Sequence, residues 1–262
     1  MEEIDVVDNE IMLLDHFENK IVVEGTLKAL TALHIGSGRN SFSPLDADNS
    51  VIRNPITQKP YIPGSSIKGV LRSYMETLLA NIEAYGTCIV TENPCWGKAA
   101  DKNKLKELKE IYKKDAEQLA RELYKELCPT CRLFGSQVMA AKLQIKDAML
   151  IGSVPVEVRD GIAIDRDTGT VAEGKKYSFE CVSAGATFKF LMTIDNAEND
   201  LQELVKMLIR ALKSGELTLG GKKSIGLGEV KLIDEKIYMI KKEDLRNYAV
   251  NGLQEEMRWT NV

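Results

Sequence analysis

LGGKKSIGLGEV, from Leu219 to Val230, joins an amphipathic pattern over 197–213 to a β-branched pattern over 229–234. A dinucleotide-binding loop has the opposite order, with a strand before its glycines and a helix directly after them. The segment also has no G-K-[ST] of a P-loop. Two interpretations remain: a bare backbone that lets a phosphate approach Lys222 and Lys223, or a tight helix-to-strand connection with solvated lysines. Its glycines are Gly220, Gly221, Gly226 and Gly228.

Working outward, the hydrophobic spacing predicts further elements around this helix-to-strand unit. Residues 20–35 are expected to form a strand, Ser65 and Ser66 to cap a helix over about 65–82, and 101–127 to form a second helix. A strand over 141–152, a projecting hairpin over 153–177 and two strands within 178–195 follow. Without the insertions, the order is strand, helix, strand, strand, helix, strand. This is the βαββαβ order of an α+β, ferredoxin-like or RRM-like domain, whose sheet has one open face and is a common platform for RNA.

Composition is ordinary for a globular protein and leaves the partner open. The 262 residues are 44% hydrophobic and 28% charged, with a net charge of −4. No apolar run reaches the roughly 18 residues that a transmembrane helix needs, and the acidic N-terminus lacks the order of a signal peptide. We therefore expect a cytoplasmic protein. A net-acidic chain can still carry a local basic surface for nucleic acid.

Four of the five cysteines form two pairs in turn-rich segments. Cys88 and Cys95 lie in GTCIVTENPCWG, and Cys128 and Cys131 form CPTC, whereas Cys181 stands alone in an apolar strand pattern. Two such pairs favour a structural Zn²⁺ site with four thiolate ligands. A redox C-x-x-C would follow a strand, but here a helix precedes it. Four unrelated buried thiols are the third interpretation.

Several motifs resemble those of the RAMP superfamily, and more narrowly the repeated backbone subunit of type III CRISPR effector complexes. They occur in the family's order and span nearly the whole chain: LHIGSG (33–38), VIRNPITQKPYIPGSSIKGVLRSYME (51–76), CRLFGS (131–136), LQIKDAML (143–150) and LGGKKSIGLGEVKL (219–232). The resemblance implies a modified ferredoxin-like fold, copies stacked along a guide RNA, and a thumb-like hairpin that wedges into the guide–target duplex. It also implies an aspartate, after the first strand, that cuts the target RNA.

Carried over to this sequence, that aspartate is Asp48 in LDADNSVIRNP, with Asp46 as the fallback. A carboxylate there can accept the proton of an RNA 2′-hydroxyl, or hold Mg²⁺ or another divalent ion against the phosphate. The alternative is an Asp-rich turn that caps the next strand.

The resemblance also suggests where the RNA lies. Ser65, Ser66, Lys68 and Arg72 are expected to hold the guide backbone at a helix N-terminus, with surface ion pairing as the alternative for the two cations. Gly220, Gly221, Lys222 and Lys223 provide the second contact. Arg159, Arg166 and Lys175 lie in the thumb candidate. His34 is expected to be structural, although it lies near the same end of the sheet.

These observations predict one RAMP domain over 1–262. Its core covers 20–85 and 136–235, with a helical zinc-binding insertion at 86–135, a thumb-like hairpin at 153–180 and a C-terminal extension at 236–262. The expected function is an endoribonuclease, active within the complex and dependent on a divalent metal, that binds crRNA and cleaves the complementary target RNA. Its partners are crRNA, target RNA, other CRISPR effector subunits and further RAMP copies. The alternatives are a scaffold that has lost cleavage and, ranked last, a ribonuclease that processes the crRNA precursor.

Overall fold

The protein folds into a mixed α+β structure, known here from a computed structural model that describes residues 11–40, 49–82, 85–98 and 101–260. Its central sheet has four strands in the order β10-β1-β9-β5, and every neighbouring pair is antiparallel. Along the chain these strands alternate with two helices as β1, α1, β5, β9, α5, β10. The bounds are β1 Asn19–Ala29, α1 Gly64–Leu79, β5 Leu143–Ile145, β9 Thr187–Asp195, α5 Asn199–Ser214 and β10 Val230–Lys241.

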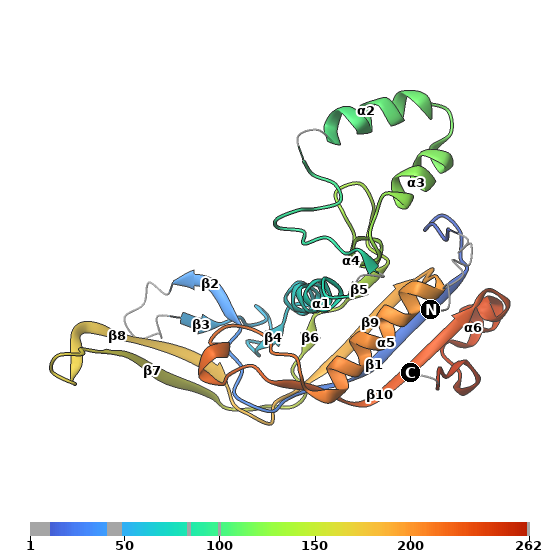
Figure 1. Ribbon diagram of the computed structural model, residues 1–262. Helices are drawn as coiled ribbons and strands as arrows, with labels where there is room; N and C mark the ends of the chain where they lie inside the picture. Colours follow the sequence, from blue (N-terminus) through green and yellow to red (C-terminus); the bar gives the residue numbers. More distant parts are fainter. Residues whose placement is uncertain (1–10, 41–48, 83–84, 99–100, 261–262) are drawn as a thin grey trace.

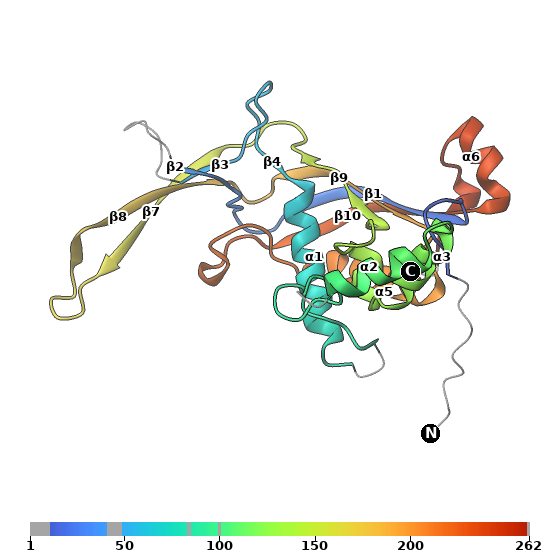
Figure 2. The ribbon, with the colours of Figure 1, turned by 90° about the horizontal axis from the view of Figure 1, so that it is seen from above.

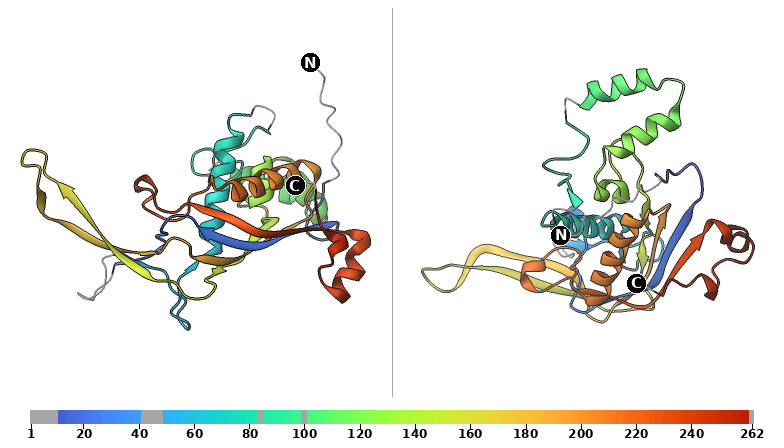
Figure 3. Two further views of the ribbon diagram at one scale, coloured as in Figure 1. Left: turned by 90° about the horizontal axis from the view of Figure 1, so that it is seen from below. Right: turned by 45° about the vertical axis from the view of Figure 1, so that its right-hand side comes forward.

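One face of this sheet carries the core. Alternate residues of β1 and β9 point to it, because successive side chains of a strand lie on opposite faces; Ile21, Val23, Phe188 and Phe190 are all buried there. Helices α1 and α5 both cover this face with their apolar stripes (Figures 2 and 3). The opposite face is partly covered by the C-terminal segment, which contains α6 (Leu245–Asn251).

A second sheet carries the projecting hairpin. Its order is β2 (Gly36–Asn40), β3 (Asn49–Val51), β8 (Val171–Val182) and β7 (Val156–Ile164). Strands β7 and β8 extend away from the rest of the molecule (Figure 1), and this confirms the hairpin predicted over 153–177. The first strand was predicted over 20–35, but β1 ends at Ala29. Leu33 instead pairs with Val182, so the chain there has already crossed to the second sheet.

The inserted helices differ from the prediction of one helix over 101–127. The structure has α2 (Asp101–Ile111) and α3 (Ala116–Lys125), followed by the short α4 (Pro129–Phe134). The break occurs where the Asp115 side chain accepts a hydrogen bond from the Gln118 N–H and starts a new helix. Figure 1 shows α2 and α3 standing away from the sheet, and α2 buries no residue.

A buried ion pair attaches α3 to the core. Lys142 Nζ lies 2.7 Å from both carboxylate oxygens of Glu198, and these side chains are only 2% and 5% exposed. The Tyr124 hydroxyl of α3 donates to Glu198 Oε1 at 2.8 Å, and its ring lies 4.8 Å from the Lys142 ammonium. Burial lowers the pKa of Lys142, and the Glu198 carboxylate opposes that shift. Tyr124 therefore helps to shield the Lys142–Glu198 ion pair from solvent.

Two predicted strand boundaries also change. The strand expected over 141–152 is divided into β5 and β6 (Ala148–Met149), and β6 pairs with β4 (Tyr61–Ile62) instead of with the central sheet. The strand expected over 229–234 continues as β10 to Lys241. In the part of the chain that the structure describes, no helix is long and apolar enough to cross a membrane.

Candidate functional site

The four paired cysteines converge on one point beside α1. Cys88 and Cys95 lie in the loop after that helix, Cys128 is the N-cap of α4, and Cys131 lies within it. All four Sγ atoms lie within 4.8 Å of one another. The Cys88 Sγ is 3.3 Å from that of Cys131 and 3.6 Å from that of Cys128. Their convergence contradicts the interpretation as four unrelated thiols.

The cluster fits a tetrahedral metal ion. A Zn–S bond of about 2.3 Å places tetrahedral sulfurs roughly 3.8 Å apart, close to the separations observed. All four cysteines are free thiols, Cys131 is buried and the other three are half-buried. Hydrogen bonds from Cys131 and Cys95 lower the pKa of Cys128, whereas burial raises the pKa of Cys88 to about 11. Four soft sulfur ligands suit a thiolate-binding metal far better than Mg²⁺ or Ca²⁺.

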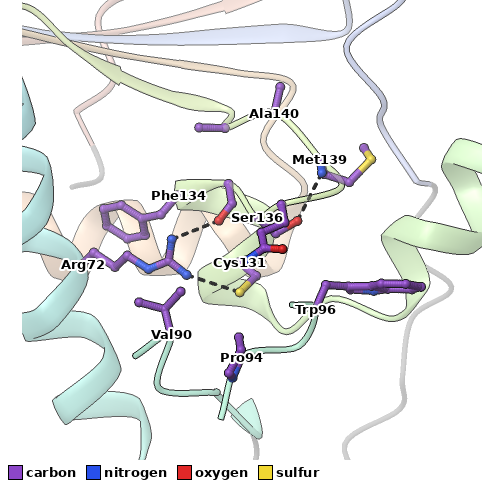
Figure 4. Close-up of a pocket in the computed structure, with 12 residues that line it drawn as sticks. Arg72, Val90, Pro94, Trp96, Cys131, Phe134, Ser136, Met139 and Ala140 are labelled. Carbon is purple, nitrogen blue, oxygen red and sulfur yellow. Dashed lines mark hydrogen bonds between the residues drawn. The ribbon is translucent and has the colours of Figure 1, made fainter. Parts of the chain in front are cut away.

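Arg72 connects this cluster to α1. Its guanidinium donates from Nη2 to Cys131 Sγ at 3.3 Å and from Nη1 to the Gly135 carbonyl at 2.9 Å (Figure 4). Its Nε also donates to Glu76 Oε1 at 2.8 Å. Burial opposes the charge of Arg72, but the hydrogen bond to Glu76 and the neighbouring thiols raise its pKa. The side chain lines a cavity of about 400 Å³ together with Trp96 and Phe134. Its RNA contact stays a prediction, and the donors just described already face partners within the protein.

We expect Arg72→Gln to weaken the hold of the cluster on its metal. Four thiolates around a divalent ion carry a net negative charge, which a guanidinium hydrogen-bonded to one sulfur partly neutralises. Loss of such a partner typically costs 10–100-fold in metal affinity. The measurement is the rate of metal release to a chromogenic chelator. Arg132→Gln is the control. Arg132 follows Cys131 directly in α4, but its guanidinium lies over the ring of Tyr124. Equal release rates for the Arg72 variant and the wild type would contradict this role.

The N-terminus of α1 is arranged differently from the prediction. Pro63 is the N-cap and makes no side-chain cap, so the prediction that Ser65 and Ser66 cap the helix is wrong. The carboxylate of Asp147, in the turn between β5 and β6, accepts from the Gly64 N–H at 2.8 Å and takes that role. Ser65 is exposed and Ser66 half-buried. Lys68 donates to the Leu143 carbonyl at 3.2 Å, and burial together with Arg72 lowers its pKa.

The glycine-rich segment forms a tight turn against residues 32–34. The Gly221 N–H donates to the His34 carbonyl at 2.8 Å. A Cβ on Gly220, where φ is +79°, would lie 2.2 Å from that carbonyl oxygen, so this backbone approach requires glycine. Beyond the glycines, a short 3₁₀ turn covers Lys223–Ile225. Lys223 lines a hollow of about 270 Å³ together with Gly69 and Ser73 of α1. The structure therefore brings the glycine-rich segment and α1 together.

Lys222 joins the same segment to the base of the hairpin. Its Nζ donates to the Tyr177 hydroxyl at 2.9 Å and lies 4.2 Å from the centre of the Tyr177 ring and 4.9 Å from that of Phe179. His34 is buried, its Nδ1 lies 2.6 Å from the Glu180 carbonyl and its ring meets Phe179 edge-on. This packing agrees with the structural role expected for His34. Sequence reasoning missed Tyr177 and Phe179, whose signal was the alternation of β8.

The remaining predicted residues lie on the hairpin and in the loop between β2 and β3. Arg159 pairs with Glu157 on its own strand at 2.9 Å, and Arg166 is exposed in the turn between β7 and β8. Lys175 lies in β8. Asp46 and Asp48 fall outside the described residues.

The base of the loop that contains Asp48 is held by a residue that sequence reasoning missed. The Glu180 carboxylate accepts from the Val51 N–H at 3.0 Å and pairs with Arg53 at 2.9 Å. The Ile52 N–H donates to the Ile35 carbonyl at 2.8 Å. The strands at the two ends of the loop, β2 and β3, are thus paired with each other, and β3 is held against β8. The only signal for this in the sequence was a single carboxylate within the apolar strand YSFECV.

The sequence matches a known class of protein. The family model described as the RAMP superfamily matches residues 26–231. The chain therefore belongs to the RAMP superfamily, and this confirms the resemblance predicted from the motifs.

Individual relatives narrow the comparison to one member of that class, the proteins named CRISPR system Cms endoribonuclease Csm3. The protein of that name from Streptococcus thermophilus is 31% identical over 241 residues, 90% of this chain and 96% of that protein. The one from Methanocaldococcus jannaschii is 27% identical over 238 residues, 86% and 84% of the two chains. The match to the Methanothermobacter thermautotrophicus protein is 42% identical over 72 residues, 28% of this chain and 29% of that protein.

Proposed function

We propose that this chain is a backbone subunit of a type III CRISPR effector complex that binds crRNA and cleaves the complementary target RNA. The observation that carries the proposal is the similarity to endoribonucleases named Csm3 over 96% of the length of one of them. The subunit would act in the cytoplasm, where its partners are the two RNA strands, other effector subunits and further copies of itself. The experiment that tests it is the cleavage of a labelled target RNA by the complex assembled on a guide.

The domain is proposed to be a modified ferredoxin-like fold. Support comes from the order β1, α1, β5, β9, α5, β10 and from the sheet order β10-β1-β9-β5, in which β1 lies between the third and fourth strands of the unit. We assign residues 20–85 and 136–241 to the core, 86–135 to a zinc-binding insertion, 153–180 to the thumb and the residues after Lys241 to a C-terminal extension. The predicted boundary between 235 and 236 falls inside β10, which belongs to the central sheet as far as Lys241. The four-thiolate geometry supports Zn²⁺ as a structural ion in the insertion.

The guide RNA is proposed to run between α1 and the glycine-rich segment. The hollow shared by Lys223, Gly69 and Ser73 supports this path, since Gly69 has no atom within 4 Å of an added Cβ and leaves room for a backbone. Lys68 directly precedes Gly69 on the same helix, and Ser65 and Ser66 lie about one turn before it. These groups would contact phosphates and sugars and would read no base, so sequence recognition stays with the guide.

Removing the charges of Lys222 and Lys223 is expected to weaken RNA binding and to flatten its salt dependence. Each phosphate that a lysine no longer neutralises lowers the slope of log K against log salt by about 0.7 for single strands. The double change to glutamine should therefore reduce the slope by up to about 1.4, measured by fluorescence anisotropy with a labelled RNA strand. Lys106 and Lys109, both exposed on α2, provide a control of equal charge. An unchanged slope in the Lys222 and Lys223 variant would reduce the segment to a structural turn.

Cleavage is proposed to occur at the loop between β2 and β3. The 2′-oxygen of a splayed nucleotide would form a bond to the neighbouring phosphorus while the P–O5′ bond breaks. The Asp48 carboxylate would accept the proton of the 2′-hydroxyl, and the departing O5′ would take a proton from water. A divalent ion, when bound, would supply charge stabilisation at that phosphate. Support comes from the two strands that flank this segment: β2 pairs with β3, and β3 pairs with β8 of the thumb, where the Val51 N–H donates to Glu180.

Experiments can distinguish two alternative functions from the proposed one. A scaffold without activity would bind the guide and assemble but would leave the target intact. A ribonuclease that processes the crRNA precursor would cut repeat RNA as an isolated protein. The buried and hydrogen-bonded state of His34 disfavours that second alternative, because His34 is the histidine that would have to serve it near the glycine-rich segment.

A further inference from the structure

The face of the central sheet opposite the core helices is divided into two halves. At one half, Val22, Tyr238 and Ile240 are covered by the C-terminal segment through Met257. At the other half, towards the end of β1 and the start of β10, the outward side chains include Lys28, Lys189 and Lys231, and all three lysines are exposed. Figure 3 shows α6 at one end of the sheet only, at the end away from the hairpin. Within the part of the chain that the structure describes, no C-terminal helix covers the lysine-bearing half.

The register of the strands places the three lysines next to one another. Lys28 of β1 lies directly opposite Lys231 of β10. On its other side Lys28 faces Thr187 of β9, and Lys189 follows two residues later on the same face, opposite Thr26. Directly opposite Cβ atoms in an antiparallel pair are about 5 Å apart, and diagonal neighbours lie about 7–8 Å apart. We call this group of Lys28, Lys189 and Lys231 the lysine strip.

The lysine strip lacks a counter-charge among the described residues. None of its three ammonium groups forms an ion pair or a hydrogen bond with that part of the chain, although Lys20, at the far end of the same face, pairs with Asp195 at 2.8 Å. Glu24 of β1, Asp234 of β10 and Glu229 just before β10 are among the carboxylates within four residues of Lys28 or Lys231, and none of them forms an ion pair with a lysine of the strip. Two lysines directly opposite each other destabilise a sheet. The arrangement is unfavourable in the free protein and becomes favourable once an anion lies across it.

We propose that the lysine strip binds the phosphate backbone of the guide RNA and extends the guide path from the glycine-rich segment onto the open face of the sheet. This inference rests on the proposed function. The strip begins where that segment ends, since Lys231 is three residues beyond Gly228, and Glu229 there hydrogen-bonds to Leu30 and Thr31 of the turn that follows Lys28. Its neighbours Thr26 and Thr187 are half-buried and offer hydroxyl groups, and in these described strands no aromatic ring lies between the lysines on which a base could stack. The lysine strip is therefore suited to contact phosphates without distinguishing one RNA base from another.

The test compares two triple variants of the full-length protein with a fluorescein-labelled oligouridine strand as the probe. Lys28, Lys189 and Lys231 are changed to glutamine in one variant, and Lys102, Lys106 and Lys109 of α2 in the other, so that both lose the same charge. We expect the first variant alone to lose about 2 units of the salt slope, because each phosphate contact contributes about 0.7. A second arm adds a labelled target strand to protein already loaded with guide, and its binding should be equal in the two variants.

A stability measurement separates this site from a merely structural one. Lys231→Gln removes the repulsion with Lys28, so its melting temperature should equal or exceed that of the wild type while its affinity for oligouridine falls. An unchanged salt slope in the lysine-strip variant overturns the inference, and the proposed function survives that result if the Lys222 and Lys223 variant still loses slope. A defect confined to the target arm, or to association with another subunit, assigns the strip to a different partner and also overturns it. Wild-type protein that binds no RNA would refute the proposed function itself.

Discussion

Asp48→Ala is expected to lower the rate of target RNA cleavage by about 10²–10⁴, the usual contribution of a general base, while guide binding and assembly stay close to those of the wild type. The reason is the position of the residue. It belongs to a polar loop whose ends are held by other groups, the Glu180 carboxylate and the pairing of β2 with β3. Its loss should therefore affect the transition state far more than ground-state binding. The measurement is single-turnover cleavage of a labelled target by the assembled complex.

Asp46→Ala is the matched control and should retain most of the activity. Cleavage that is lost in the Asp46 variant and normal in the Asp48 variant would place the nuclease in the same loop but on the other residue. Normal cleavage in both variants would move the active site elsewhere. A wild-type complex that binds guide and target but never cuts would establish the scaffold alternative.

Cys131→Ala should remove the metal and destabilise the protein. Wild-type protein is expected to retain about one zinc ion per chain through dialysis, because the four Sγ atoms already lie within 4.8 Å of one another. The metal's binding free energy contributes to folding. A loss of about 3 kcal/mol, at the upper end of ordinary substitutions, would lower the melting temperature by roughly 6–12 °C for a domain of about this size. Elemental analysis and thermal unfolding measure the two effects.

Cys181→Ala provides the comparison for that experiment. Cys181 is also buried, and its change to alanine likewise removes one sulfur atom. It lies in β8 beside Phe179 and Leu227, away from the cluster. It should keep its zinc and lose only packing energy. Wild-type protein free of metal would argue against a structural ion. A Cys131 variant with the same melting temperature as the Cys181 variant would do so too.

The sequence was informative wherever residues near each other in the chain determine the structure. Helical spacing located α1 and α5, and the paired cysteines in two turn-rich segments indicated that they would meet. Asp115 is itself a good N-cap residue, so the break between α2 and α3 was available from local sequence and was overlooked.

Contacts between distant residues could not be predicted in this way. Asp147 caps α1 from 83 residues away, so the nearby serines, which are equally good caps in isolation, are not used. Arg72 fits a phosphate-binding pattern one turn after Lys68, yet folding turns its guanidinium towards Cys131, 59 residues further along the chain. Glu180 reaches Arg53 through the pairing of β8 with β3, and Lys222 reaches Tyr177 because the glycine-rich segment packs beside β8; no local pattern specifies either contact.

The buried pair of Lys142 and Glu198 has a consequence for the evolution and engineering of this family. Both charges belong to the core, but the ring that shields them, Tyr124, belongs to the inserted helices. The insertion is therefore not a detachable module, because a shorter loop in its place would leave the pair without its cover. Removing one charge alone is no remedy, since an unmatched buried ion typically costs about 3–5 kcal/mol. A homologue or a minimised variant without these helices must therefore replace both charges together, so that the two regions are expected to change as one unit.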